Sequence, residues 1–192
     1  MMSPIRPGLP DYLAPGLSIL FVGINPGLRS SEVGHHYAGH SNRFWKLLFD
    51  AGLVPDRMTC QDDWRLLDYG YGLTNLIAKP TAGIQDLVKQ DFLQGRQTLV
   101  RKIKKYQPAI VAVLGVSVAR VLFPFMLSKV SGKGLAGFSV QTGLLPVALA
   151  GVRVFVLPNP SGRNAHYSYQ KMKDLFNQLK SVSRQTSLPV MN

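Results

Sequence analysis

Four short apolar runs along the chain are each followed by a change to turn-forming residues. The first covers about residues 18–24 and leads into Gly23-Ile24-Asn25-Pro26-Gly27. A weaker run covers residues 72–77, and two clear ones cover residues 109–115 and 152–157. Runs of this length that end at Gly, Asn or Pro are typical of buried strands. We therefore predict four strands at these positions.

Segments between these runs space their apolar residues as a helix does. The clearest covers residues 42–52, where Ser41 or Asn42 can cap the helix and Gly52 can end it. Other helices are expected at residues 60–69, 90–106, 116–123 (with Ser117 as the cap) and 168–182. Two stretches break the pattern. Residues 28–40 are expected to form an irregular functional loop, and residues 124–151 a Gly-rich excursion or hairpin.

Strands that alternate with helices predict an α/β fold with a parallel sheet covered on both faces. A length of 192 residues fits one domain with a core of its own. The proline-rich start predicts a flexible N-terminal arm over residues 1–16. We place the domain at residues 17–184 and a tail at residues 185–192.

Two of the predicted strands end in similar turns, Asn25-Pro26-Gly27 and Asn159-Pro160-Ser161-Gly162. Carboxyl ends of parallel strands share one edge of the sheet, so the two loops can flank a single crevice. An Asn side chain can position a water molecule or a base edge but cannot act as a general base. Apart from Glu32, neither loop contains a carboxylate, so the chemistry of this crevice depends on amides. An ordinary turn is the alternative reading of Asn-Pro-Gly.

The charge balance adds a candidate partner. The chain has 22 Lys and Arg against 10 Asp and Glu, a net charge of +12. Such an excess is typical of proteins that bind a polyanion, most simply nucleic acid, although it can also serve solubility. No run approaches the roughly 20 apolar residues of a membrane helix, so we expect no membrane contact.

The single cysteine, Cys60, cannot form an internal disulfide and fits a reducing compartment. Three histidines, His35, His36 and His40, lie close together, but no Cys or carboxylate stands at metal-ligand spacing. Gly115-Val116-Ser117 is similar to a nucleophile elbow only superficially, because the second glycine is missing. We therefore expect no metal and no cofactor.

Several spaced motifs, in one order from about Leu17 to Leu179, resemble the mismatch-specific uracil-DNA glycosylase and thymine-DNA glycosylase family. They are Gly23-Ile24-Asn25-Pro26-Gly27-Leu28, Gly34-His35-His36-Tyr37, Asn42-Arg43-Phe44-Trp45-Lys46, Gly72-Leu73-Thr74-Asn75 and Leu157-Pro158-Asn159-Pro160-Ser161-Gly162. The resemblance implies a three-layer α/β/α fold with a central, mostly parallel sheet. It also implies a monofunctional enzyme that flips a damaged base out of duplex DNA and hydrolyses its N-glycosidic bond.

Residue roles follow from the same resemblance. Asn25 would be catalytic and hold the attacking water, and Tyr37 would stack on the flipped base. The base pocket would also include Ile24, Ser30, Asn75 and Thr81. The wedge loop facing the opposite base would contain Asn159, Ser161, Gly162, Arg163 and Asn164. Without the resemblance, each of these residues also has an ordinary structural interpretation. Tyr37 could be a packed surface aromatic, Asn75 a turn residue and Arg163 a solvated charge.

One position departs from the common bacterial pattern of this family. Those enzymes usually carry Leu after the loop glycine, whereas this chain has Arg163, as the thymine-acting relatives do. A guanidinium can both stack and reach phosphates, so insertion into the base stack is still expected. The Gly34-His35-His36-Tyr37 motif also resembles the thymine-acting branch.

The expected partner is double-stranded DNA with a mismatched or damaged base, bound by a monomer. The substrate would be uracil, with thymine, ethenocytosine or other damaged bases as further candidates, and the reaction would begin base excision repair. We expect a cytoplasmic bacterial protein that works at the nucleoid. The alternatives are a non-catalytic nucleic-acid-binding module on the same fold and a nucleotide-binding α/β hydrolase or transferase.

Overall fold

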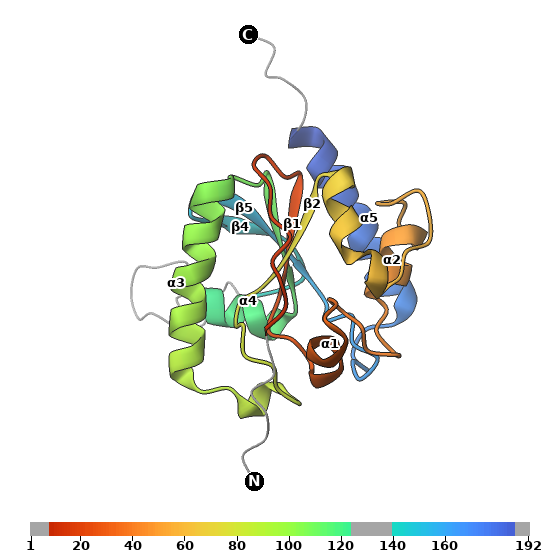
Figure 1. Ribbon diagram of the computed structural model, residues 1–192. Helices are drawn as coiled ribbons and strands as arrows, with labels where there is room; N and C mark the ends of the chain where they lie inside the picture. The colour runs from red at the N-terminus through yellow and green to blue at the C-terminus, as the bar shows by residue number, and fades with distance from the viewer. Residues whose placement is uncertain (1–7, 124–139, 187–192) are drawn as a thin grey trace.

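The computed structural model describes residues 8–123 and 140–186 as a three-layer α/β/α domain (Figure 1). Five strands form one sheet in the order β2-β1-β3-β5-β4, all parallel except β4, which pairs antiparallel with β5. The strands are β1 (Ile19–Gly23), β2 (Tyr71–Asn75), β3 (Ile110–Leu114), β4 (Gly143–Leu149) and β5 (Val152–Leu157). The helices are α1 (Leu28–Val33), α2 (Phe44–Asp50), α3 (Lys89–Tyr106), α4 (Val116–Leu122) and α5 (Tyr169–Thr186), with 3-10 helices η1 (Cys60–Tyr69) and η2 (Ile84–Asp86). The expected fold class is confirmed.

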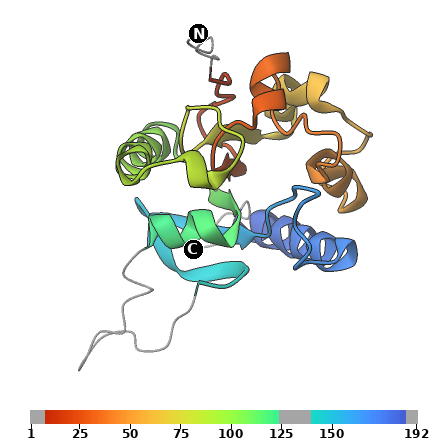
Figure 2. The same cartoon turned by 90° about the horizontal axis from the view of Figure 1, so that it is seen from below.

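The central strands are apolar throughout because both faces of the sheet are buried. On β1, Phe21 packs with Phe44 of α2 and Phe176 of α5. Its neighbour Leu20 points the other way, into the core that α3 and α4 cover. Figure 2 shows these two pairs of helices on opposite sides of the sheet. This alternation explains why the strands read as unbroken apolar runs rather than as alternating patterns.

The order of the strands creates a natural crevice beside β1. After β1 the chain crosses to β2 on one side, and β3 then returns to the other side of β1. In open α/β sheets, ligands bind at such a switch point, outside the carboxyl ends of the strands. The loops after β1, β2, β3 and β5 all open on this edge because those strands are parallel.

Two stretches that broke the pattern are now resolved in part. The expectation of an irregular loop at residues 28–40 is wrong for Leu28–Val33, which form α1. Gly34 ends this helix with φ 79°, a left-handed conformation that glycine adopts without strain. The end of the Gly-rich segment forms β4, which the sequence did not predict as a strand, and β4 makes an antiparallel hairpin with the expected strand β5. Its register is irregular around Pro146, which has no N–H to donate. Residues 124–139 lie outside the described residues.

The first described residues belong to the folded body, so the boundary expected at residue 17 lies too late. Tyr12 forms an antiparallel bridge with Leu73, exchanging hydrogen bonds of 2.9 and 3.0 Å. Asp11 forms an ion pair of 2.6 Å with Lys102 of α3. The bridge covers the exposed edge of β2, which would otherwise present unpaired backbone groups. None of the helices within residues 8–123 and 140–186 is long and apolar enough to cross a membrane.

Helix α3 packs very close to the loop after β2, and Gly95 makes this possible. A Cβ atom at Gly95 would lie 2.4 Å from the carbonyl oxygen of Leu76 and 3.2 Å from the Ile77 side chain. Both neighbours are buried, and the first is backbone that cannot rotate away. The glycine therefore sets the distance between the helix and the loop.

We predict that Gly95→Ala destabilises the protein, although alanine favours a helix by about 1 kcal/mol. Overpacking should outweigh this gain and lower the free energy of unfolding by about 1–3 kcal/mol. Urea unfolding followed by circular dichroism measures the change. Gln97→Ala on the exposed face of α3 is the control and should leave stability unchanged or slightly raised. A Gly95→Ala variant as stable as the Gln97→Ala control would contradict the close-packing explanation.

Candidate active site

A cavity of about 730 Å³ opens at the carboxyl edge of the sheet, within the size range of small-molecule sites. The loops after β1, β2, β3 and β5 all contribute to its lining, as expected from the strand order. Among the residues expected from the sequence, those that line it are Ile24, Asn25, Ser30, Tyr37, Asn75, Thr81, Asn159, Ser161, Arg163 and Asn164. The expected two-loop crevice is therefore present.

Asn25 is held by one end of its amide. Its Nδ2 donates to Thr81 Oγ1 at 2.8 Å and to the Lys79 carbonyl at 2.9 Å. A carbonyl only accepts hydrogen bonds, so the nitrogen must face Lys79. The Thr81 hydroxyl donates to the Gly83 carbonyl at 2.8 Å, which leaves its lone pairs for Asn25. Oδ1 of Asn25 therefore points away, and no protein group in the described ranges donates to it.

The loop that carries Asn25 is held by backbone pairing that continues past the strands. Leu76 and Ile77 donate to the carbonyls of Gly23 and Ile24, each at 2.8 Å. Further on, Thr81 donates its N–H to the Pro26 carbonyl at 3.1 Å. The stiffness expected from Pro26 and the glycines thus has a second cause, pairing with the segment after β2. Thr81, expected only as a pocket residue, also braces the Asn25 amide.

Tyr37 adopts a backbone conformation that is rare for a bulky residue, with φ 53°. Its neighbours hold it there. The backbone N–H of Ala38 donates to Ser30 Oγ at 3.0 Å, and Arg29 Nε donates to the Ala38 carbonyl at 3.2 Å. On the other side, Trp45 Nε1 donates to the His36 carbonyl at 3.3 Å. Strain that is maintained by this many contacts is typical of functional sites.

A buried carboxylate anchors the same loop from the side of η1. Asp63 is completely buried and accepts hydrogen bonds from the His36 N–H at 2.9 Å and from His35 Nδ1 at 3.2 Å. Burial and a hydrogen bond to Asp63 raise the pKa of Tyr12 to about 12. Nothing in the sequence pattern pointed to Asp63, because its partners lie 27 or more residues away.

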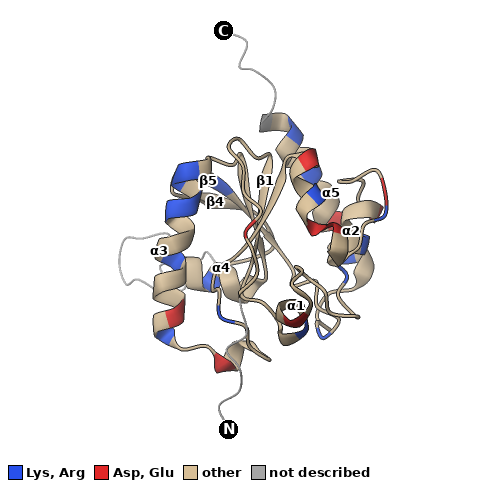
Figure 3. Cartoon of the chain, in the orientation of Figure 1, with Lys and Arg blue, Asp and Glu red and all other residues tan. Residues whose placement is uncertain are grey.

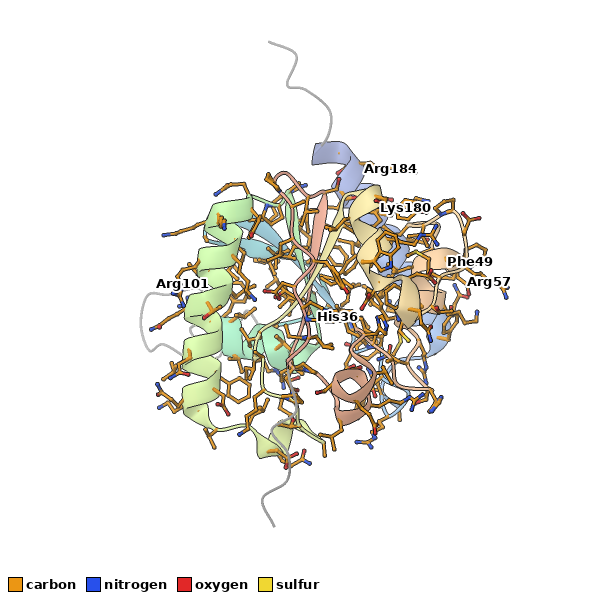
Figure 4. All side chains as sticks on the ribbon, in the orientation of Figure 1. His36, Phe49, Arg57, Arg101, Lys180 and Arg184 are labelled. Carbon is orange, nitrogen blue, oxygen red and sulfur yellow. The ribbon has the colours of Figure 1, made fainter. Side chains whose placement is uncertain are left out.

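His36 lies in the interior of the molecule (Figure 4), where it is almost completely buried. Its Nε2 lies 2.8 Å from the Pro10 carbonyl, so this nitrogen carries the proton. Burial lowers the pKa of His36, which keeps the ring neutral. His36 therefore joins the N-terminal segment to the Tyr37 loop.

Three groups meet at the end of β1. A Cβ atom at Gly23 would lie 2.6 Å from Asn75 Oδ1 and 3.1 Å from the Tyr37 hydroxyl. Gly23 is thus required, because these two side chains occupy the space of its own. The Tyr37 ring packs against Phe44, with a centroid distance of 4.1 Å. One face of the Tyr37 ring is therefore covered by Phe44, and Tyr37 is also among the residues that line the cavity.

The second loop is docked onto the start of α2. Arg43 donates its N–H to the Pro160 carbonyl at 2.9 Å. Gly162 lies so close to Ser41 that a Cβ there would clash at 2.4 Å, so Gly162 supports the loop and does not itself line the cavity. Asn159 Oδ1 accepts from the Ser161 N–H at 2.9 Å. A final bond joins Asn164 Nδ2 to the Asn159 carbonyl at 2.9 Å.

Arg163 is exposed at the tip of this loop. No hydrogen bond or ion pair joins its guanidinium to the described part of the chain, although its backbone N–H donates to Ser161 Oγ at 3.3 Å. The side chain is therefore available to a ligand beside the mouth of the cavity.

Several lining residues were missed from the sequence. Ser117 was expected to cap α4, but Gly115 occupies the cap position without a side-chain bond, and Ser117 lines the cavity. His166 and Tyr167 enter from the loop before α5. Their position close after the Asn159 turn was the only available signal. Arg29 was likewise hidden in the segment expected to be irregular.

Charge around the cavity is positive, but the basic residues are not concentrated there. Arg29 and Arg163 line the cavity, and none of its lining residues in the described ranges is Asp or Glu. Figure 3 shows further Lys and Arg along α3. Of these, Lys104 and Lys105 lie in its last turn, at the opposite edge of the sheet from the cavity. The excess of positive charge is therefore spread over the domain.

A second cavity of about 480 Å³ adjoins the first and shares Tyr37, Gly39 and Asn42 with it. Its wall includes Phe49, over which the Arg57 guanidinium lies at 5.3 Å from the ring centroid (Figure 4). The second cavity therefore also has basic residues, Lys46 and Arg57, in its lining.

Fold and site together define an α/β protein with a ligand crevice at the switch point of a parallel sheet. Residues 10–180 match the family model of the Uracil DNA glycosylase superfamily, and the chain belongs to this superfamily. Membership indicates a hydrolase of the DNA glycosylase type, with DNA as its partner.

A solved structure agrees with this fold. It is the solution NMR structure of a protein from Methanosarcina acetivorans, described as a candidate uracil DNA glycosylase. The two chains share 18% sequence identity and superpose with a TM-score of 0.57, over 91% of this chain and 98% of the other. At this identity the match supports the fold alone.

We predict that Asp63→Ala destabilises the protein by about 2–3 kcal/mol, because it leaves the buried His36 N–H without an acceptor. The free energy of unfolding in urea measures the loss. Asp62→Ala is the matched control, because Asp62 is partly exposed and makes only a cap of η1 and a surface ion pair with Arg65 at 3.2 Å. Its loss should cost about 1 kcal/mol. Equal losses in the two variants would show that Asp63 does not brace the Tyr37 loop.

Proposed function

We propose that this chain is a monofunctional glycosylase that hydrolyses the N-glycosidic bond of uracil in mismatched duplex DNA. The observation that carries the proposal is the Asn25 amide, whose nitrogen is bound by Lys79 and Thr81 while its oxygen is left free. An amide oriented in this way accepts a hydrogen bond from a water molecule and aims it. It is less suited to a module that only binds DNA, which needs no oriented water.

The reaction needs only water as a co-reactant. The bond between C1′ of the sugar and N1 of uracil breaks, and its electron pair leaves with the base, where the ring carbonyls share the charge. Glycoside cleavage develops positive charge on the sugar, so a water molecule held by Asn25 can add to C1′ without a strong base. The water loses one proton, which balances the charge taken by uracil. This agrees with the lack of carboxylates among the described lining residues.

Charge on the departing base calls for hydrogen-bond donors that are already in place. The backbone N–H of Tyr37 donates to no acceptor in the described part of the chain, and its residue is held by its neighbours. It is therefore a donor that needs no rearrangement during the reaction. Ile24 completes the wall beside Asn25.

Preference for mismatches is supported by the cost of flipping. Removing a base from the stack costs a few kcal/mol, and least where the pair is already weak. The loop with Asn159 and Arg163 stands at the mouth of the cavity, where a side chain can fill the space that the base leaves. Asn164 and Gly162 belong to the same loop and would face the opposite base.

The deciding experiment is turnover of a duplex with one U·G pair, followed by alkaline cleavage of abasic sites. We expect cleavage at the uracil, slower cleavage at U·A, and release of free uracil. A panel with thymine, hypoxanthine, xanthine and ethenocytosine opposite each of the four bases defines the range. Intact strands throughout the panel at excess protein would reject the glycosylase and favour the binding module.

We predict that Asn25→Ala lowers kcat for uracil release at least about 100-fold, because the water is no longer positioned. The dissociation constant for duplex DNA should change little. Thr81→Val should give a smaller loss, since it removes the brace and keeps Asn25, whereas Thr81→Ser should resemble the wild type. Single-turnover kinetics and fluorescence anisotropy separate the two effects. Cleavage by Asn25→Ala at the wild-type rate would remove this residue from the mechanism.

We predict that Arg163→Ala weakens binding to a U·G duplex about tenfold, because a contact to the stack or the phosphates is lost. Arg163→Lys keeps the charge but not the planar group, so it separates stacking from simple attraction. Arg101→Ala is the control, because Arg101 is exposed on α3 (Figure 4). Unchanged affinity of Arg163→Ala would show that this side chain is not the wedge.

A further inference from the structure

The peptide unit between His36 and Tyr37 contains the N–H that would stabilise the departing base. Its other polar group is the His36 carbonyl, which accepts a hydrogen bond from Trp45 Nε1 at 3.3 Å. A peptide unit is planar, and the described residues contain no cis peptide bond, so this carbonyl and this N–H point in opposite directions. A group that holds the carbonyl therefore also fixes the direction of the N–H.

Trp45 is itself held rigidly. It lies in the first turn of α2 and is buried, with 7% of its surface exposed, and its bond to His36 is shielded from water. Its indole ring packs edge-on against Phe44, at a centroid distance of 5.1 Å and an angle of 82°. Arg43, at the start of the helix, donates its N–H to the Pro160 carbonyl at 2.9 Å. The indole N–H is therefore a fixed donor.

The peptide units on either side are fixed from other elements. The His36 N–H donates to Asp63 at 2.9 Å, and the Ala38 N–H donates to Ser30 Oγ at 3.0 Å. Between them, the Tyr37 N–H has no acceptor in the described part of the chain. Asp63 and Ser30 thus limit the loop on both sides, while the Trp45 bond acts on the peptide unit that carries the free N–H.

We propose that Trp45 is a positioning residue, whose indole N–H holds the His36 carbonyl and thereby aims the Tyr37 N–H at the departing base. This inference rests on the proposed glycosylase function. Trp45 lines the second cavity and not the first, so it acts through the Tyr37 backbone and does not touch the base. Its contribution belongs in kcat, because the charge that the N–H stabilises develops only as the glycosidic bond breaks.

The leaving group supplies a signature of this role. Uracil departs with negative charge on its ring, and 5-fluorouracil departs more easily because fluorine withdraws electron density from that ring. A hydrogen-bond donor to the departing base matters less for the better leaving group. Loss of the Trp45 N–H should therefore slow the release of uracil more than that of 5-fluorouracil. A residue that only supports the fold would slow both releases equally, because the folded fraction is the same for each substrate.

The experiment replaces Trp45 with 3-benzothienylalanine, in which sulfur stands where the indole has its N–H, so the bond is lost and the ring size is kept. Single turnover at saturating protein is measured on U·G and 5-fluorouracil·G duplexes. We expect about a tenfold loss on uracil, less than the roughly 100-fold or more that follows complete removal of such a donor. The loss on 5-fluorouracil should be at most about threefold. The protein concentration for half-maximal rate should stay within about twofold of the wild type.

Two natural substitutions complete the set. Trp45→Phe also removes the N–H and should show the same selective loss, together with a lower thermal stability because the smaller ring leaves a void. Trp64→Phe is the matched control, because Trp64 lies on η1 with 55% of its surface exposed. It should match the wild type on both substrates.

The outcomes separate this inference from the function on which it rests. A wild type that releases neither base rejects the glycosylase itself. An active wild type with an equally fast 3-benzothienylalanine variant overturns the role of the Trp45 N–H. Equal losses on the two bases also overturn it, because Trp45 would then only support the fold. A loss seen only as a higher protein concentration for half-maximal rate overturns it as well, because Trp45 would then serve DNA binding.

Discussion

The pairing of the segment after β2 with the loop after β1 is the constraint on which the rest of the site depends. Hydrogen bonds from Leu76 and Ile77 to the carbonyls of Gly23 and Ile24 extend the sheet beyond its strands. The bond from Thr81 to Pro26 closes this extension and brings the Thr81 side chain to the Asn25 amide. If the backbone pairing stopped where the strands end, the Asn25 side chain would be free to rotate. The sheet itself therefore orients the catalytic candidate.

The strained backbone of Tyr37, on the other wall of the cavity, is also held in place by hydrogen bonds. Tyr37 sits in a left-handed conformation because the groups on either side of it are bound by Ser30, Arg29 and Trp45. Asp63, which is completely buried, adds an anchor through the backbone of His36. Each bond is worth only about 1 kcal/mol, but together they exceed the strain of a single residue. The cavity is thus preorganised on both sides, which an enzyme that stabilises developing charge requires.

Membership in the Uracil DNA glycosylase superfamily and the geometry of the cavity provide different information about the same site. The family indicates DNA and a glycosylase reaction. The geometry adds which end of the Asn25 amide is available, and that the floor beside Gly23 carries an acceptor and a donor. The spread of positive charge over α3 shows that the excess of basic residues describes the whole domain and does not by itself locate the DNA.

Local patterns in the sequence were sufficient for four of the five strands, most helices and the two turns at one edge of the sheet. Apolar runs and their Gly, Asn and Pro boundaries act over a few residues, so they can be read without a structure. They failed at α1, whose short sequence has no apolar period, and at the N-terminal segment, whose order comes from pairing with Leu73. The partners of Asn25 lie more than 50 residues away, and those of Asp63 at least 27. Only the tertiary structure could decide these contacts, because hydrogen bonds between distant segments depend on how the layers pack and leave no period in the sequence.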